Sequence, residues 1–79
     1  MNRDDIRKKA TGIFRAVFDD DTIEISDYTT AEDIEDWDSL SNITLVCELE
    51  AAFNYKFSMK EVVGMRNVGD LLDILERNI

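Results

Sequence analysis

Residues 38–53 read DSLSNITLVCELEAAF, a run without glycine or proline that decides the fold. Asp38 and Ser39 belong to residue types that favour the first positions of a helix, and no helix breaker follows them. The run therefore predicts a helix that begins at Asp38 or Ser39 and ends near Phe53.

This predicted helix is apolar on two sides. At helical spacing, one face carries Leu45, Val46, Leu49 and Phe53. The roughly opposite face carries Leu40, Ile43 and Cys47. A surface helix of a small bundle needs only one buried stripe, so the second stripe indicates either complete burial or a surface kept for a partner. We expect Leu40 and Ile43 to be much more exposed than Leu49 and Phe53.

The N-terminal segment also follows a helical period, with charged residues between its apolar positions. These apolar positions are Ile6, Ala10, Ile13, Phe14 and Val17. The run Asp19-Asp20-Asp21 ends the pattern, so we expect the first helix to end near Phe18.

Between residues 19 and 38 no period is sustained. A connection of about 20 residues is unusual in a compact domain and is normally either functional or a misread element. We expect an ordered loop that is held to the core by scattered apolar anchors. These anchors are Ile23, Ile25, Tyr28, Ile34 and Trp37.

The C-terminal third contains two further helix signals. Ser58 and Glu61 form a capping box, and Gly64 is placed to close the short helix that follows it. Asn67 can cap the last helix, whose first turn contains Asp70. The apolar stripe of this helix consists of Val68, Leu71, Leu72, Leu75 and Ile79. The chain is thus predicted to be all-α, a small four-helix bundle of three main helices and one short helix, with a long loop between the first two.

Composition narrows the classes of function. The chain has 79 residues, 44% of them hydrophobic, with three glycines and no proline. This suits one compact helical domain, residues 1–79, and leaves little room for a deep substrate cleft. Nine Lys and Arg against eighteen Asp and Glu give a net charge of -9, which repels nucleic acid and anionic membrane surfaces. The same field attracts proteins with basic patches.

Residue types that enzymes depend on are missing. The chain has no histidine, so Ser–His and Cys–His catalysis are excluded and we expect no enzymatic activity. The single Cys47 cannot form an internal disulfide and is expected to pack as a small hydrophobe. The acidic runs at 19–21 and 32–38 lack the spacing of a calcium-binding EF-hand, so we expect no metal site. Without a secretory signal or an apolar run of roughly 20 residues, a cytoplasmic protein that does not insert into membranes is expected.

The segment Trp37-Asp38-Ser39-Leu40 resembles the acyl carrier protein family. In that family an Asp-Ser-Leu motif opens the second helix, and its serine is esterified to phosphopantetheine. Leu49-Glu50 followed by Phe53 is similar to the end of the family's second helix, and Val68-Gly69-Asp70-Leu71 is similar to the opening of its last helix. The small size, the acidity and the long first loop also agree, so the resemblance covers nearly the whole chain.

This resemblance implies a free-standing carrier that holds an acyl or related group as a thioester on a phosphopantetheine arm attached to Ser39. A phosphopantetheinyl transferase would move the arm from coenzyme A to Ser39 with magnesium, and Asp38 would help it recognise the site in addition to capping the helix. Acyl-loading and acyl-processing enzymes with basic patches would dock on Leu40, Ile43 and Cys47. The arm's phosphate would lie near unsatisfied N–H groups at the helix start. We expect the carrier to be a monomer.

The chain departs from fatty-acid carriers around the motif. Many of them have glycine two residues before the Asp-Ser pair and acidic residues soon after it. Here those positions hold Asp36, Ser41 and Thr44, and only Glu48 and Glu50 keep part of an acidic face. The pathway therefore stays open among fatty-acid, polyketide, peptide and polysaccharide-modification biosynthesis, with the primary fatty-acid synthase disfavoured.

Two other functions stay open. A helical adaptor would bind a partner through Leu40, Ile43 and Cys47 and leave Ser39 unmodified. An aminoacyl or peptidyl carrier would use the same arm and the same fold. Intact mass after incubation with coenzyme A and a transferase separates the adaptor from the carriers, and the identity of the loading enzyme separates the two kinds of carrier.

Overall fold

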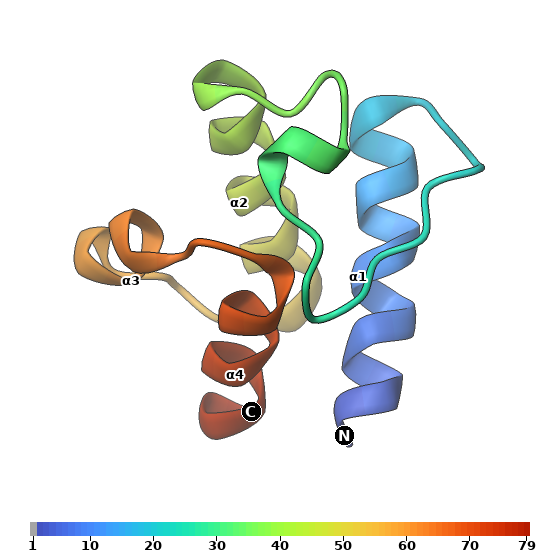
Figure 1. The fold of residues 1–79 in the computed structure, drawn as a ribbon. Helices are drawn as coiled ribbons and strands as arrows, with labels where there is room; N and C mark the ends of the chain where they lie inside the picture. Colours follow the sequence, from blue (N-terminus) through green and yellow to red (C-terminus); the bar gives the residue numbers. More distant parts are fainter. Residues whose placement is uncertain (1) are drawn as a thin grey trace.

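The fold is known from a computed structural model, which describes residues 2–79 (Figure 1). The helices are α1 (Arg3–Phe18), α2 (Ser39–Phe53), α3 (Met59–Gly64) and α4 (Val68–Asn78), with a 3-10 turn, η1 (Ala31–Asp33), in the loop before α2. Helix α1 runs antiparallel to α2 and α4 and contacts both, whereas α3 lies on the side away from α1. The predicted all-α architecture of three main helices and one short helix is confirmed.

Local signals set where the two longest helices begin and end. Helix α1 is capped by Asn2, whose side chain accepts a hydrogen bond from the Asp5 N–H. Asp19 and Asn54 follow α1 and α2 in the left-handed conformation, each with φ of 51°. Asp and Asn are the residues after glycine that adopt this conformation most readily, so they end both helices at a lower conformational cost than other side chains would.

The predicted caps of the two C-terminal helices are also confirmed. Ser58 accepts from the Glu61 N–H at 3.1 Å, and the Glu61 carboxylate accepts from the Ser58 N–H at 2.9 Å. The capped helix α3 ends at Gly64, as the sequence indicates. The Asn67 side chain accepts from the Asp70 N–H at 2.8 Å and begins α4.

A single cluster of buried apolar side chains joins α1, α2, α4 and the loop. The α4 stripe is buried as predicted at Val68, Leu71, Leu72 and Leu75. Two positions of this helix differ from the prediction. Ile79 is exposed because it lies beyond the last helical residue, whereas Ile74 is buried although the stripe omitted it. Across residues 2–79, none of the helices is sufficiently long and apolar to span a bilayer.

The long loop is ordered, and four of its five predicted anchors are correct. Ile23, Ile25 and Ile34 are buried, and Trp37 packs half-buried against the core. The prediction for Tyr28 is wrong, since 85% of this residue is exposed. Its neighbour Thr29 takes the inward position instead, because its hydroxyl accepts a hydrogen bond from the Ser26 N–H at 2.8 Å and closes a local turn.

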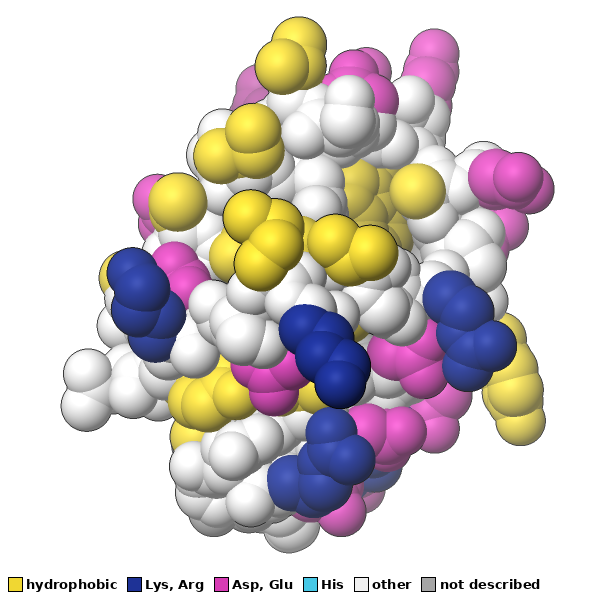
Figure 2. Space-filling model, turned by 90° about the vertical axis from the view of Figure 1, so that its left-hand side faces the viewer, with side chains coloured by type: hydrophobic (Ala, Val, Ile, Leu, Met, Phe, Trp, Pro, Cys, Tyr) yellow, Lys and Arg dark blue, Asp and Glu magenta, His cyan; other side chains and the backbone are white. Residues whose placement is uncertain are grey.

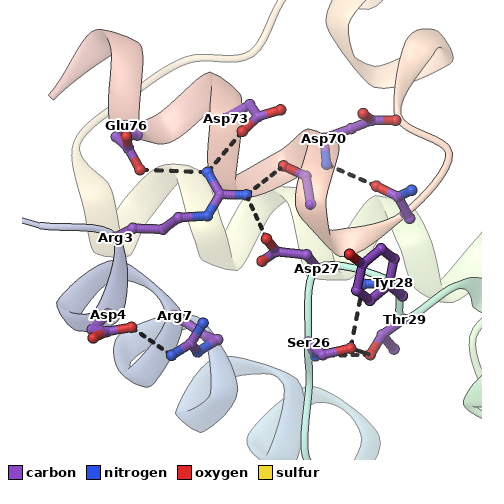
Figure 3. A network of polar contacts seen from close by, with 12 residues as sticks. Arg3, Asp4, Arg7, Ser26, Asp27, Tyr28, Thr29, Asp70, Asp73 and Glu76 are labelled. Atoms are coloured by element: carbon purple, nitrogen blue, oxygen red, sulfur yellow. Dashed lines mark hydrogen bonds and ion pairs between the residues drawn. The ribbon is translucent and has the colours of Figure 1, made fainter.

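This turn is held on the first residues of α4. The Val68 and Gly69 N–H groups donate to the carbonyls of Thr29 and Asp27 at 2.8 and 2.9 Å, so two N–H groups without helical partners are satisfied by the loop. Figure 3 shows Arg3 of α1 between the loop and α4. Its guanidinium contacts Asp27 at 3.3 Å and Asp73 at 2.7 Å. The loop is therefore fixed to both helices at the end of the bundle opposite the start of α2.

Candidate functional site at the start of α2

Helix α2 begins in a compact set of polar contacts. The Asp38 Oδ1 atom accepts from the N–H groups of Leu40 and Ser41, at 2.9 Å each. The Ser41 hydroxyl accepts from the Asp38 N–H at 2.8 Å and donates to the Asp36 carbonyl at 2.8 Å. This capping box makes Asp38 the N-cap and places Ser39 at the first helical position, which confirms the predicted helix start and the capping role of Asp38.

The same contacts determine the charge at this position. The Ser41 N–H, followed by the Leu40 N–H, holds the pKa of Asp38 below its ordinary value. Asp38 is therefore ionised at neutral pH. The expectation of unsatisfied N–H groups at the helix start is wrong for Leu40 and Ser41, because the Asp38 carboxylate already occupies both.

Trp37 ties this helix start to the rest of the bundle. Its indole N–H donates to the Asn42 side-chain oxygen at 2.9 Å, which spans the first turn of α2. Its ring meets Phe14 edge-on, with centroids 5.2 Å apart, and lies 6.4 Å from Phe18. Both phenylalanines belong to α1, so the residues before Ser39 are fixed by an aromatic cluster in addition to the cap.

Ser39 itself is exposed, and its hydroxyl takes part in no hydrogen bond within residues 2–79. Its neighbours on both sides are bound, so the hydroxyl is a free polar group on a rigid support. Such an arrangement offers an oxygen nucleophile to an enzyme that approaches from solvent.

The two faces of α2 differ as predicted. Leu40 and Ile43 are 77% and 62% exposed, whereas Leu49 and Phe53 are 1% and 7% exposed. Cys47 is also exposed, so the expectation that it packs as a small hydrophobe is wrong. It lies one turn after Ile43, on the outward face, and its side chain meets solvent instead of the core.

The exposed apolar surface continues onto α3, which the sequence reasoning missed. Met59 and Val63 are exposed there, while Val62 turns toward the core. Figure 2 shows this side of the molecule, where hydrophobic side chains gather above a group of Lys and Arg. The signal was present in the spacing, because Met59 and Val63 are four residues apart and share one side of a helix.

A cavity of about 280 Å³ opens beside Ser39, between α2, α3 and the segment that leads into α4. Its walls are mainly apolar and include Leu45, Val46, Leu49, Val62, Met65 and Leu71. Polar residues also line it, namely Asp38, Ser39, Asn42, Arg66 and Asn67. No sequence pattern indicated this cavity, because it depends on how α3 is placed against α2. Within residues 2–79, no three His, Cys, Asp or Glu side chains are grouped as metal ligands.

Comparison with solved structures identifies the family. The fold matches the solution structure of a holo acyl carrier protein from Geobacter metallireducens with a TM-score of 0.81. The two sequences are 46% identical, and the match covers 85% of this chain and 77% of the other. The chain belongs to the acyl carrier protein family. Acyl carrier proteins are carriers and not enzymes, in agreement with the absence of histidine. No protein-family model and no curated protein matches this acyl carrier protein.

Proposed function

We propose that this acyl carrier protein is modified on Ser39 with phosphopantetheine and carries an acyl group as a thioester on the thiol of that arm. The observation that carries the proposal is the exposed, unengaged Ser39 hydroxyl at the fixed start of α2. The holo form of the Geobacter protein supports the presence of a prosthetic group. Phosphopantetheine would supply the thiol that forms the thioester, which no residue of this chain needs to provide.

The residues around Ser39 have separate tasks in this function. A transferase brings coenzyme A, the Ser39 oxygen forms a bond to the phosphate of the arm, and adenosine 3′,5′-bisphosphate leaves. The serine proton passes to a base that the transferase supplies. Asp38 caps α2 and Trp37 holds the preceding residues, so the hydroxyl is presented in one orientation.

The cavity beside Ser39 supports an acyl cargo. Its apolar lining residues, among them Leu45 and Leu71, would remove part of a hydrocarbon chain from water. This burial is favourable by roughly 25 cal/mol per Å² of apolar surface. The arm begins at the edge of this cavity, so a tethered chain can enter it without leaving the carrier. The mainly apolar walls favour an uncharged acyl chain over an aminoacyl group, because placing an ammonium against them would cost desolvation energy.

Partner enzymes would dock on the exposed apolar side chains next to the arm. These are Leu40, Ile43 and Cys47 on α2, together with Met59 and Val63 on α3. The transferase and the acyl-processing enzymes must all reach Ser39, so one surface would serve them in turn. We propose further that the carrier acts as a cytoplasmic monomer. It would serve a specialised pathway instead of primary fatty-acid synthesis, since Ser41 and Thr44 of α2 stand where many fatty-acid carriers have acidic residues.

The test is incubation with coenzyme A, magnesium and a permissive phosphopantetheinyl transferase, followed by intact-mass and peptide mapping. The natural chain should gain one phosphopantetheinyl group on the peptide that contains Ser39. Ser39→Ala should gain nothing and keep its helical circular dichroism, whereas the control Ser58→Ala should be loaded like the natural chain. No gain in the natural chain, or equal gain in Ser39→Ala, would refute the proposal and favour the adaptor with an unmodified serine.

A further inference from the structure

The proposed function places a phosphodiester on Ser39, next to the ionised Asp38 carboxylate. Two N–H groups that would otherwise bind an anion at this helix start are engaged by Asp38. Residues 19–53 contain no Lys or Arg, so neither the loop nor α2 supplies a compensating positive charge. Any cationic side chain that pairs with an anion attached to Ser39 therefore belongs to another element.

Among the residues that the structure describes, 2–79, Arg66 is the one basic residue that lines the cavity beside Ser39. Its backbone N–H donates to the Asp70 carboxylate at 2.9 Å, and its Nε lies 3.3 Å from the same oxygen. These contacts hold the pKa of Asp70 below its ordinary value and fix the near end of the guanidinium. The two terminal nitrogens make no contact of this kind within residues 2–79, and the side chain is 84% exposed. Arg66 thus presents a free fork of donors at the mouth of the cavity.

Two amide side chains add donors to the same lining. The Asn42 oxygen is engaged by the Trp37 indole, and the Asn67 oxygen is engaged by the Asp70 N–H. Both oxygens are fixed, so each amide presents its NH₂ group as the remaining hydrogen-bonding group. A cavity intended only for a saturated hydrocarbon chain has no use for a guanidinium and two amide donors. Asp38 also lines the cavity, but its Oδ1 atom already accepts from two backbone N–H groups, so the free donors of the lining suit a ligand that carries acceptor oxygens.

We propose that Arg66 recognises an anionic oxygen group tethered through Ser39, with Asn42 and Asn67 as neighbouring donors. The proposal rests on the loading of Ser39 proposed above. The group is either the phosphodiester of the arm or a carboxylate at the far end of the cargo, since a guanidinium binds both through paired N–H groups. In the second case, Arg66 determines specificity and the carrier accepts dicarboxylic acyl groups in preference to plain fatty acyl groups.

The experiment loads the chain from coenzyme A, hexanoyl-coenzyme A and glutaryl-coenzyme A with a permissive transferase, and compares melting temperatures before and after loading. Glutaryl and hexanoyl chains have similar length, and only glutaryl ends in a carboxylate. Arg66→Gln removes the proposed contact. Lys60→Gln is the matched control, because it removes one positive charge from an exposed residue of α3 that does not line the cavity. Each change in melting temperature is taken within one variant, so the loss of the Asp70 contact cancels.

The expected result is a loading shift about 2–5 °C smaller in Arg66→Gln than in the natural chain, with no such loss in Lys60→Gln. Loss with every cargo identifies the phosphodiester as the anion, and loss with glutaryl alone identifies the carboxylate. Equal shifts in all three proteins, or equal losses in both variants, would overturn the proposal. Failure of the natural chain to gain mass would instead refute the function on which it rests, and this inference with it.

Discussion

Gly69→Ala tests whether the loop is held on α4 as the structure shows. A Cβ atom at residue 69 would lie 2.6 Å from the Asp27 carbonyl oxygen and 3.2 Å from the Asn67 side-chain oxygen. The first of these is backbone and cannot rotate away, so the loop must move. That movement would weaken the 2.9 Å hydrogen bond from the Gly69 N–H to the same carbonyl. Arg3 opposes the movement, because its guanidinium holds the Asp27 side chain.

The change in the free energy of unfolding is the sum of two destabilising contributions and one stabilising contribution. Overpacking costs about 1–3 kcal/mol, and weakening a hydrogen bond costs about 0.5–1.5 kcal/mol. Alanine regains up to about 1 kcal/mol of helix propensity relative to glycine. The free energy of unfolding should therefore fall by about 1–3 kcal/mol, which corresponds to a loss of about 5–20 °C in melting temperature for a domain of this size.

Gly12→Ala is the control, because a Cβ at that position meets nothing within 4 Å. Gly12 lies in the middle of α1 and is exposed, so alanine should raise the free energy of unfolding by about 0.5–1 kcal/mol. Urea unfolding followed by circular dichroism at 222 nm measures both variants. The same chemical change is thus expected to act in opposite directions at two positions. If Gly69→Ala were as stable as the natural chain, the close approach of loop and helix would be wrong.

Three further outcomes are expected. Leu49→Ala should lower the free energy of unfolding by about 2–5 kcal/mol and Leu40→Ala by no more than about 0.5 kcal/mol, and similar losses in urea unfolding would contradict the two-faced helix. Ile43→Glu should slow loading by a transferase at least about tenfold and leave the melting temperature unchanged. The control Ala51→Glu, at the far end of α2, should be loaded at the natural rate. Equal loading rates for the two variants would show that docking does not use this face. The pKa of Asp38 is lower in the folded chain, so its stabilising effect is complete above the unfolded value near 3.8 and is lost as pH falls below it. Asp38→Asn should therefore show a shallower loss of stability in acid unfolding, and an unchanged slope would exclude this contribution.

Helix ends could be predicted from the sequence because the interactions that set them are local. Ser58 with Glu61, Asn67 with Asp70, and Asp38 with the following N–H groups each act within three residues. The position of Ser39 at the first turn of α2 was likewise predicted from its own motif. The partner of a capping residue lies a few positions away in the sequence, so the predicted helix starts agree with the structure.

The errors concern contacts between distant parts of the chain. Hydrophobicity alone predicts that Tyr28 is buried and Thr29 exposed. The turn that docks on α4 reverses this and places the threonine inside. Cys47 is apolar enough to pack, but among residues 2–79 no element covers its face of α2. The placement of Arg66 could not be predicted from the sequence. Arg66 and Ser39 line a common cavity only because α3 and the segment after it lie against α2.

Arg3 also determines how the molecule can be handled. It joins the first turn of α1 to Asp73 and Glu76 in α4, at 2.7 and 3.4 Å. The two ends of the described chain consequently lie at the same end of the bundle, while α2 begins at the other end (Figure 1). A surface or fluorescent label attached through either end would leave Ser39 directed toward the medium. An immobilised array of this carrier should therefore present its hydroxyl groups outward, open to whichever enzyme is flowed across it.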